Sequence, residues 1–385
     1  MEVTRRQLLA SAATLLLDQW SRAHCMADPS RRNTERKVVL VLCGGMRRED
    51  TFANSGLLNI PHLCRDLQPK GVFYSSVRNN GVTSHFNTIA SVLTGNWQRL
   101  DDWGKLPPAS PTIFEYLRKA MRLQQNEAWL ISSNKALTSR IGASEVSGYG
   151  PDYGANVIFP KQLLINAVVH AASQGRAVHS TDRTTVLPEI EAILNSDNYD
   201  GLGWSIGEDP STVNKPALGA IQQAIEDLIR TSYPVTGDEF TFLVAAEVIR
   251  RFSPSLMVIT YSDMEVAHFG SYSLHLSGIG TVDRLVFELW NLLESLPDYK
   301  DKTTLMVLPE FGRDFDGSTT NGFFNHRQDG ESTRSTWMMC LGEAVRHAQI
   351  IEDPVEQTSI CPTIANLFEA KHLNLPGQIL PGLWL

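Results

Sequence analysis

Cysteine is scarce in this chain of 385 residues, which contains five. None of them lies in a Cys-x-x-Cys pair, and this absence argues against a zinc–thiolate site. Cys43 and Cys340 fall in strand-like apolar runs and Cys361 in a helical one, so we expect buried thiols that behave as small apolar groups. A disulfide would suit an exported protein, but the spacing alone does not pair the cysteines.

The sequence also lacks an excess of basic residues and a long apolar run. The 34 Lys and Arg stand against 42 Asp and Glu, a net charge of −8, so nucleic acid is not an expected partner. No segment beyond the N-terminal region approaches the ~20 apolar residues that a membrane helix needs. We therefore expect no stable membrane span after signal removal. A hydrophobic content of 42% fits one large domain, with or without an insertion.

Residues 1–27 have the layout of an export signal. Arg5 and Arg6 precede an Ala/Leu-rich run that ends at Leu17 and is too short to span a bilayer. This layout indicates a twin-arginine signal and predicts a periplasmic or otherwise extracytoplasmic protein. An ordinary amphipathic N-terminal helix is the alternative. Residues 28–36 form a polar spacer before the domain that we expect over 37–385.

Continuous apolar runs predict strands that are buried on both faces. The runs lie at 37–43, 128–131, 256–261, 304–308 and 336–341. Helical periodicity separates several of them, at 111–117, 282–296 and 361–368. Strands that alternate with helices predict an α/β fold with a doubly wound, mainly parallel sheet between layers of helices.

The stretch from about 135 to 215 differs from the rest of the chain. It is rich in Ser, Gly, Asn and Asp and has few apolar strands, so we expect an insertion or cap over one end of the sheet. Helical stretches near 217–232 and 238–251 lead back to the predicted core.

Carboxylates and imidazoles follow successive strands in the second half of the chain. Asp263 and His268 come just after one apolar run, Glu310 just after the next, and His326 in a Gly/Asn-rich loop. An open α/β sheet gathers such side chains in the crevice at the carboxyl ends of its strands. The pattern therefore predicts a metal site there, although each histidine alone is as compatible with a structural hydrogen bond.

A turn rich in hydroxyl and imidazole groups precedes another predicted helix. Thr83, Ser84 and His85 open this helix, which ends at Thr94-Gly95. Amides at its start would favour a bound phosphate or sulfate. The competing interpretation is that Thr83 or Ser84 simply caps the helix.

The order of these segments resembles the alkaline phosphatase superfamily, which includes phosphatases, sulfatases and cofactor-independent phosphoglycerate mutases. The twin-arginine start and the stretch 309–313 (Pro-Glu-Phe-Gly-Arg) are most similar to an exported sulfatase-like branch. In that family a first strand ends in a metal-binding Asp, a nucleophile opens a helix ending in Thr-Gly, and later Asp and His residues complete a metal site. The resemblance covers residues 37–385.

The sequence departs from the family pattern at several site positions. Gly44 stands where the first-strand Asp is expected, His85 stands at the nucleophile position, and Glu310-Phe311 replaces an Asp-His pair. Thr83 and Ser84 are neighbouring candidates for the nucleophile in a shifted register. Asp263 and His268 are one residue further apart than in the family.

The remaining residues could provide ligands for one metal ion. The resemblance implies that Asp263, His268 and His326 bind one divalent ion, zinc or manganese, with Glu310 or His85 as a fourth partner. Glu310 would serve as ligand or general base.

Two basic residues near these positions are candidates for substrate binding. Arg47 or Arg313 would hold an anionic group bidentately, unless each is simply solvated or salt-bridged.

Two hypotheses follow. In the first, the protein is an exported metal-dependent hydrolase of small phosphate or sulfate esters with a reduced, mononuclear site. In the second, it is a catalytically inactive member of the same fold, a pseudoenzyme without a metal that binds a protein partner outside the cytoplasm. The losses at Gly44, His85 and Phe311 motivate the second hypothesis.

Overall fold

The structure is a computed structural model that describes residues 36–101, 105–134, 138, 140–160, 236–317, 322–370 and 373–384. The predicted export signal, all of the polar spacer except Arg36, most of the predicted insertion and the helix expected near 217–232 lie outside the described residues.

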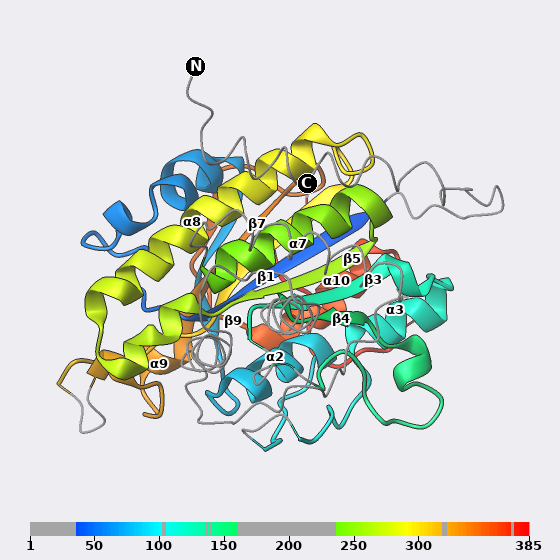
Figure 1. The fold of residues 1–385 in the computed structure, drawn as a ribbon, viewed down its shortest axis with the longest axis horizontal. Helices are drawn as coiled ribbons and strands as arrows, with labels where there is room; N and C mark the ends of the chain where they lie inside the picture. Colours follow the sequence, from blue (N-terminus) through cyan, green and yellow to red (C-terminus); the bar gives the residue numbers. More distant parts are fainter. Residues whose placement is uncertain are drawn as a thin grey trace, which may run out of the picture.

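One mixed sheet of nine strands organises the described part of the chain (Figure 1). Its order is β4-β3-β5-β1-β6-β7-β2-β8, with β9 also paired to β2. β7 runs antiparallel to β6 and β2, and the other pairs are parallel. The strands are β1 Lys37–Gly45, β2 Gly71–Arg78, β3 Ala128–Ser132, β4 Asn156–Ile158, β5 Leu256–Tyr261, β6 Thr303–Phe311, β7 Ser335–Gly342, β8 Gln349–Ile351 and β9 Val355–Glu356. The predicted α/β class and mainly parallel sheet are confirmed.

Helices cover both faces of this sheet. The longer ones are α2 His85–Thr94, α3 Ile113–Met121, α7 Gly237–Phe252, α8 Tyr272–Ser295 and α10 Ile360–Leu367. Shorter turns are α9 Glu331–Arg334, η1 Leu57–Asn59, η2 His62–Leu67, η3 Gln68–Lys70, η4 Gln125–Glu127, η6 Pro151–Tyr153, η7 Asp263–Phe269, η8 Gly322–Phe324 and η9 Gln357–Ser359. No helix among the described residues is long and apolar enough to cross a membrane.

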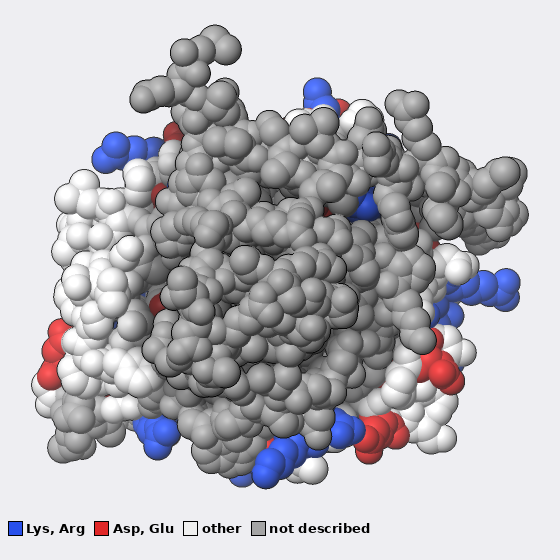
Figure 2. All heavy atoms as spheres, viewed as in Figure 1, with Lys and Arg blue, Asp and Glu red and all other residues white. Residues whose placement is uncertain are grey.

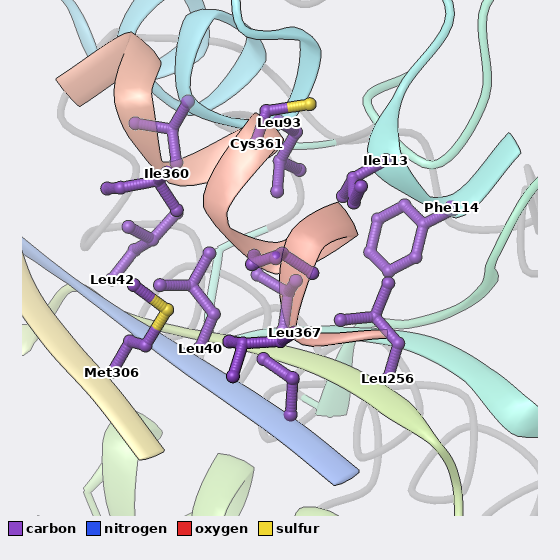
Figure 3. Close-up of a cluster of buried hydrophobic side chains, with 14 of the residues drawn as sticks. Leu40, Leu42, Leu93, Ile113, Phe114, Leu256, Met306, Ile360, Cys361 and Leu367 are labelled. Carbon is purple, nitrogen blue, oxygen red and sulfur yellow. The ribbon is translucent and has the colours of Figure 1, made fainter. Parts of the chain in front are cut away.

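Alternation along the strands divides the core between the two faces. Val39 and Val41 of β1 face the side covered by α7 and α8, which lie next to each other (Figure 1). Leu40 and Leu42 face the opposite side, where α2, α3 and α10 pack. Figure 3 shows Cys361 of α10 among the apolar side chains of this second layer. Burial on both faces explains why the central strands are continuous apolar runs in the sequence.

Local sequence signals fix several helix ends. Thr112 and Glu115 form a capping box at the start of α3, and Thr236 and Glu239 form another at the start of α7. Gly95, with φ 72°, ends α2 in the left-handed conformation that glycine tolerates best. These caps set where α3 and α7 begin and where α2 ends.

Part of the predicted insertion belongs to the main sheet. β4 lies within the 135–215 stretch and pairs in parallel with β3 at the sheet edge, with Leu130 opposite Val157. The described stretch 140–160 therefore extends the core.

Charged side chains are spread around the visible described surface. Figure 2 shows Lys and Arg interspersed with Asp and Glu near the periphery of this view, without a broad patch of one sign.

Candidate metal centre

Three neighbouring strands place the candidate site at the carboxyl edge of the sheet. β1 pairs with β5 on one side and β6 on the other, so the segments that follow these strands meet. β5 leads into η7, which carries Glu265 and His268, and β6 ends with Glu310 and Phe311. His85 enters from the first residue of α2.

Four side chains converge at this edge: His85, Glu265, His268 and His326. One ligand atom from each lies within 4.8 Å of the others. His268 Nε2 is 3.0 Å from Glu265 Oε2 and 3.2 Å from His326 Nε2, and His85 Nε2 is 3.3 Å from the same Glu265 oxygen. Metal–nitrogen bonds of 2.0–2.1 Å in a tetrahedron give ligand-to-ligand distances of about 3.3 Å. The three contacts of 3.0–3.3 Å are close to this spacing, and the whole set lies within 4.8 Å, a cluster that could hold one ion.

The buried Nε2 atom of His85 supports the same conclusion. His85 is 3% exposed, and its Nε2 makes no hydrogen bond among the described residues although it faces the centre of the cluster. A buried polar atom without a hydrogen bond is costly and calls for an explanation. Its contact with Glu265 at 3.3 Å is an ion pair without hydrogen-bond geometry, and a metal ion bound through Nε2 would give this nitrogen a directed partner.

In His85 and His326, the ring nitrogen opposite Nε2 is anchored as in metal-binding histidines. His85 Nδ1 lies 2.7 Å from Glu310 Oε2, and His326 Nδ1 lies 2.7 Å from the Thr83 carbonyl oxygen. Histidines that bind metals usually donate their second N–H to a carboxylate or backbone carbonyl, which fixes the ring and its tautomer. Both contacts leave Nε2 directed at the cluster.

Glu265 is held by two further donors. Its Oε1 accepts a hydrogen bond of 2.5 Å from the Gly45 amide, and its Oε2 accepts one of 2.5 Å from Arg313 Nη2. A Cβ added at Gly44 would lie 2.3 Å from Glu265 Oε1 and 2.9 Å from the Met264 sulfur. Glycine at 44 is therefore what makes room for the Glu265 carboxylate.

Phe311 forms an apolar wall beside the cluster. Its ring stacks on His326 with centroids 4.1 Å apart and lies 4.9 Å from the His85 ring. Phe311 is fully buried, so it excludes water from that side and offers no ligand atom.

Proton affinities differ sharply within the cluster when no metal is bound. Burial opposes charge on His85, but the Glu265 and Glu310 carboxylates outweigh it and raise the pKa of His85 well above its usual value. Burial lowers the pKa of His268 to about 4 and that of His326 well below its usual range. His268 and His326 are therefore neutral near pH 7 and have a lone pair for a metal, whereas His85 must release its proton to bind one.

The two carboxylates also titrate differently. Burial raises the pKa of Glu310, and the charge on His85 offsets only part of that rise. Burial would raise the pKa of Glu265 as well, but the charges of Arg313 and His85 lower it well below its usual range. Glu265 is thus the permanently charged member of the site.

The structure does not bring Asp263 to the cluster. Asp263 Oδ2 instead accepts a hydrogen bond from the Asp238 amide, 2.8 Å away at the start of α7, and Asp238 accepts one from the Asp263 amide at 3.0 Å. Glu265, two residues later in η7, turns toward the histidines in its place. Of the predicted ligands, His268 and His326 come together, while Glu310 stands behind His85.

Sequence reasoning overlooked Glu265. The available signal was its spacing, because residues three apart on a helical turn point to the same side, and Glu265 precedes His268 by three.

The hydroxyl groups of the predicted nucleophiles, Thr83 and Ser84, form hydrogen bonds within the protein. Thr83 Oγ1 donates to the His326 carbonyl oxygen at 2.8 Å, and Ser84 Oγ accepts from Asn87 Nδ2 at 2.8 Å. These hydroxyls connect the turn to the His326 loop and to α2, so the structure shows them in supporting positions around His85.

The predicted substrate arginines are engaged within the protein. Arg47 donates to Asp50 through Nε at 2.7 Å and to Asp316 through Nη1 at 2.7 Å. Arg313 is fully buried, and its Nε donates to the Gly45 carbonyl oxygen at 2.8 Å. Neither guanidinium has its planar edge open to a substrate anion in this arrangement.

The Asp50 cluster gives a pH-dependent prediction. Burial alone would raise the pKa of Asp50, but hydrogen bonds from His275, Arg47 and Tyr272 lower it well below its usual value. Asp50→Asn is therefore expected to cost about 1.5–3 kcal/mol at pH 7. Because the folded pKa lies below the unfolded value of about 3.9, this stabilisation is present above that value and is lost as the pH falls below it. Urea unfolding should show a gap between the two proteins that narrows at pH 3, and an equal gap at both pH values would contradict this.

Solved structures resemble this protein in fold, although their sequences differ widely from it. No protein-family model and no curated protein matches the amino-acid sequence. Among solved structures, the PsFucS1 sulfatase from Pseudoalteromonas sp. matches with a TM-score of 0.52 at 12% identity, over 97% of this chain and 74% of the sulfatase. A protein in the alkaline phosphatase superfamily from Vibrio parahaemolyticus matches with a TM-score of 0.52 at 13% identity, over 95% and 76% of the two chains. The wild-type alkaline phosphatase PafA matches with a TM-score of 0.53 at 12% identity, over 91% and 99%.

These likenesses define a class. The chain has the fold of the alkaline phosphatase superfamily, which confirms the predicted resemblance at the level of the fold; similarity to an exported sulfatase-like branch stays a prediction. The fold is one used by sulfatases and phosphatases, and the described residues include a cluster suited to one metal ion at its carboxyl edge.

Proposed function

We propose that this protein is an exported hydrolase of small phosphate or sulfate esters that works with a single divalent metal ion. The observation that carries the proposal is the convergence of three imidazole Nε2 atoms and the Glu265 carboxylate within 4.8 Å of one another. This convergence lies at the sheet edge where α/β folds bind ligands. The sulfatase and phosphatase folds similar to this one support the reaction class.

The chain's own residues would divide the work as follows. His85, His268 and His326 would hold the ion, with Glu265 as the fourth ligand, and a donor set rich in imidazole favours zinc over manganese. A bound ion would supply the Lewis acidity that polarises an ester oxygen and acidifies a water molecule. Glu310 would accept the Nδ1–H hydrogen bond of His85 and so orient the ring, while the proton that His85 releases on ligation would leave from Nε2.

The nucleophile in this proposal is water. Thr83 and Ser84 are occupied by the bonds that connect the turn to the His326 loop and to Asn87. Direct attack by water therefore requires less rearrangement than attack by either hydroxyl. Phe311 would keep bulk water from the rear of the histidines, where it would weaken their hold on a cation.

Turnover of model esters tests this function. Purified protein supplied with Zn²⁺ should hydrolyse an aryl phosphate or an aryl sulfate, and a chelator should remove the activity. His326→Ala should reduce the rate by at least ~100-fold, because loss of an outer partner alone typically costs ~10–100-fold. His347→Ala, at an exposed histidine, is the matched control. Turnover equal in the wild type and His326→Ala would refute the proposal.

The export part of the proposal rests on residues 1–27. The paired Arg5 and Arg6 and the short apolar run support a twin-arginine route. Replacing both arginines with lysine should retain the protein in the cytoplasm, as fractionation would show. Unchanged delivery to the periplasm would rule out this route.

A second candidate function is that of a binding or assembly component without catalysis. Its support is the charge balance of the metal-free site, in which Arg313 neutralises Glu265 and a protonated His85 faces Glu310. Such a site would be stable without an ion. A partner recovered by pull-down with both wild type and His326→Ala, from protein that binds no Zn²⁺, would favour this alternative over the hydrolase.

A further inference from the structure

Arg313 occupies an unusual position for an arginine. Its side chain is fully buried, directly after β6, with no exposed surface. Three oxygen atoms receive its N–H groups: the Gly45 carbonyl at 2.8 Å, the Phe323 carbonyl at 3.2 Å and Glu265 Oε2 at 2.5 Å. One carboxylate and two backbone carbonyls are also the kind of oxygen set that binds a hard divalent cation.

We infer that the Arg313 guanidinium is a built-in cation, occupying an oxygen-lined cation position beside Glu265 and thereby limiting this centre to one divalent ion. The inference rests on the proposed function for the ion held by the histidines. It adds a second position, next to the first, and names the residue that fills it.

The buried negative charge of Glu265 requires a cation at the Arg313 position. Glu265 Oε2 is shared, since it contacts Arg313 Nη2 on one side and lies 3.0 Å from His268 Nε2 on the other. A carboxylate buried without a compensating charge is strongly unfavourable, so removing the Arg313 charge creates a demand for another cation. The oxygens of Gly45 and Phe323 remain in place to bind it.

The backbone at Gly44 and Gly45 holds the Glu265 carboxylate in one orientation, whichever cation lies beside it. The Gly45 amide holds Oε1 at 2.5 Å, and the absence of a side chain at Gly44 leaves the space that this oxygen occupies. Oε2 therefore stays directed at the Arg313 position when the guanidinium is removed. An apolar side chain of similar length would fill only part of the vacated volume.

A matched pair of variants tests the inference. Arg313→Met removes the charge and retains an apolar stem, whereas Arg313→Lys retains the charge. Each protein, first saturated with Zn²⁺, is titrated with Mn²⁺, which prefers oxygen ligands. We expect Arg313→Met to take up one additional Mn²⁺ per chain and to melt at a higher temperature in its presence. The wild type and Arg313→Lys should take up none.

Two further results decide the outcome if Arg313→Met folds poorly. The double variant Arg313→Met/Glu265→Gln lacks both charges and should fold without binding additional Mn²⁺. Recovery of folded Arg313→Met by Mn²⁺ alone would support the inference. Arg313→Met that binds no Mn²⁺, or that stays unfolded in Mn²⁺ while the double variant folds, would overturn it.

Failure of the proposed function would look different. A wild type that binds no Zn²⁺ would refute the histidine-bound ion. The difference in Mn²⁺ uptake between Arg313→Met and Arg313→Lys would still test the role of Arg313 separately. Conversely, a zinc-loaded wild type with equal Mn²⁺ uptake in both variants would refute only the role of Arg313.

Discussion

Replacing Glu265 with alanine is expected to destabilise the folded protein by about 3–5 kcal/mol, the usual cost of removing one partner from a buried ion pair. Arg313 is fully buried, and Glu265 is the carboxylate to which its Nη2 donates. The same change leaves the Gly45 amide without the acceptor that lies 2.5 Å away. Both losses fall on the folded state, because water solvates these groups in the unfolded chain.

Urea unfolding followed by the fluorescence of the eight tryptophans would measure this change. Glu265→Gln keeps the shape and an acceptor for Gly45, so it isolates the contribution of charge. Arg313→Met/Glu265→Ala removes both ionic groups and should recover part of the lost stability, as a double-mutant cycle would show. A Glu265→Ala protein within ~0.5 kcal/mol of the wild type would mean that the pair is solvated rather than buried.

Removing His85 is expected to weaken zinc binding by more than ~100-fold, and removing its outer partner should weaken binding by ~10–100-fold. His85→Ala deletes a ligand atom, whereas Glu310→Gln leaves the imidazole in place and loses only the carboxylate 2.7 Å from Nδ1. Because Glu310 acts through His85, the second change should have little further effect once His85 is alanine.

Competition calorimetry with a zinc chelator would give the affinities of both single variants and the double variant. His347→Ala, an exposed histidine, controls for non-specific binding. Independent losses that simply add in the double variant would show that Glu310 acts on the site by another route than through His85.

The sheet could be predicted because its central strands are buried on both faces. Lys37–Gly45 and Leu256–Tyr261 consist entirely of buried residues and therefore appear as continuous apolar runs. β2 escaped notice because Ser75 and Ser76 interrupt its apolar pattern, where the pairing with β7 shifts register. β4 has three residues, too few for a pattern to stand out from the polar stretch around it.

The site was only partly predictable for a physical reason. Strand ends in a parallel sheet share one edge, which placed His268, His326 and Glu310 in the same region from sequence alone. Which carboxylate turns inward depends on the helical geometry of η7, and the sequence pattern does not distinguish Asp263 from Glu265 without it. The fit of Glu265 against Gly44 is a contact across more than 200 residues, which no local pattern encodes.

The role of Arg313 shows the same limit. From sequence alone, an arginine that follows a strand near candidate metal ligands is interpreted as a substrate-binding residue, because its guanidinium binds anions bidentately. Only the three-dimensional arrangement reveals that Gly45, Phe323 and Glu265 already surround it. Its positive charge then belongs to the internal balance of the site.

The central claim is a single metal centre, and the metal content of purified protein tests it most directly. Elemental analysis after incubation with Zn²⁺ and gel filtration should find one zinc ion per chain, and His85→Ala prepared in parallel should contain almost none. Wild-type protein that emerges free of metal, or that carries two ions per chain, would contradict the account.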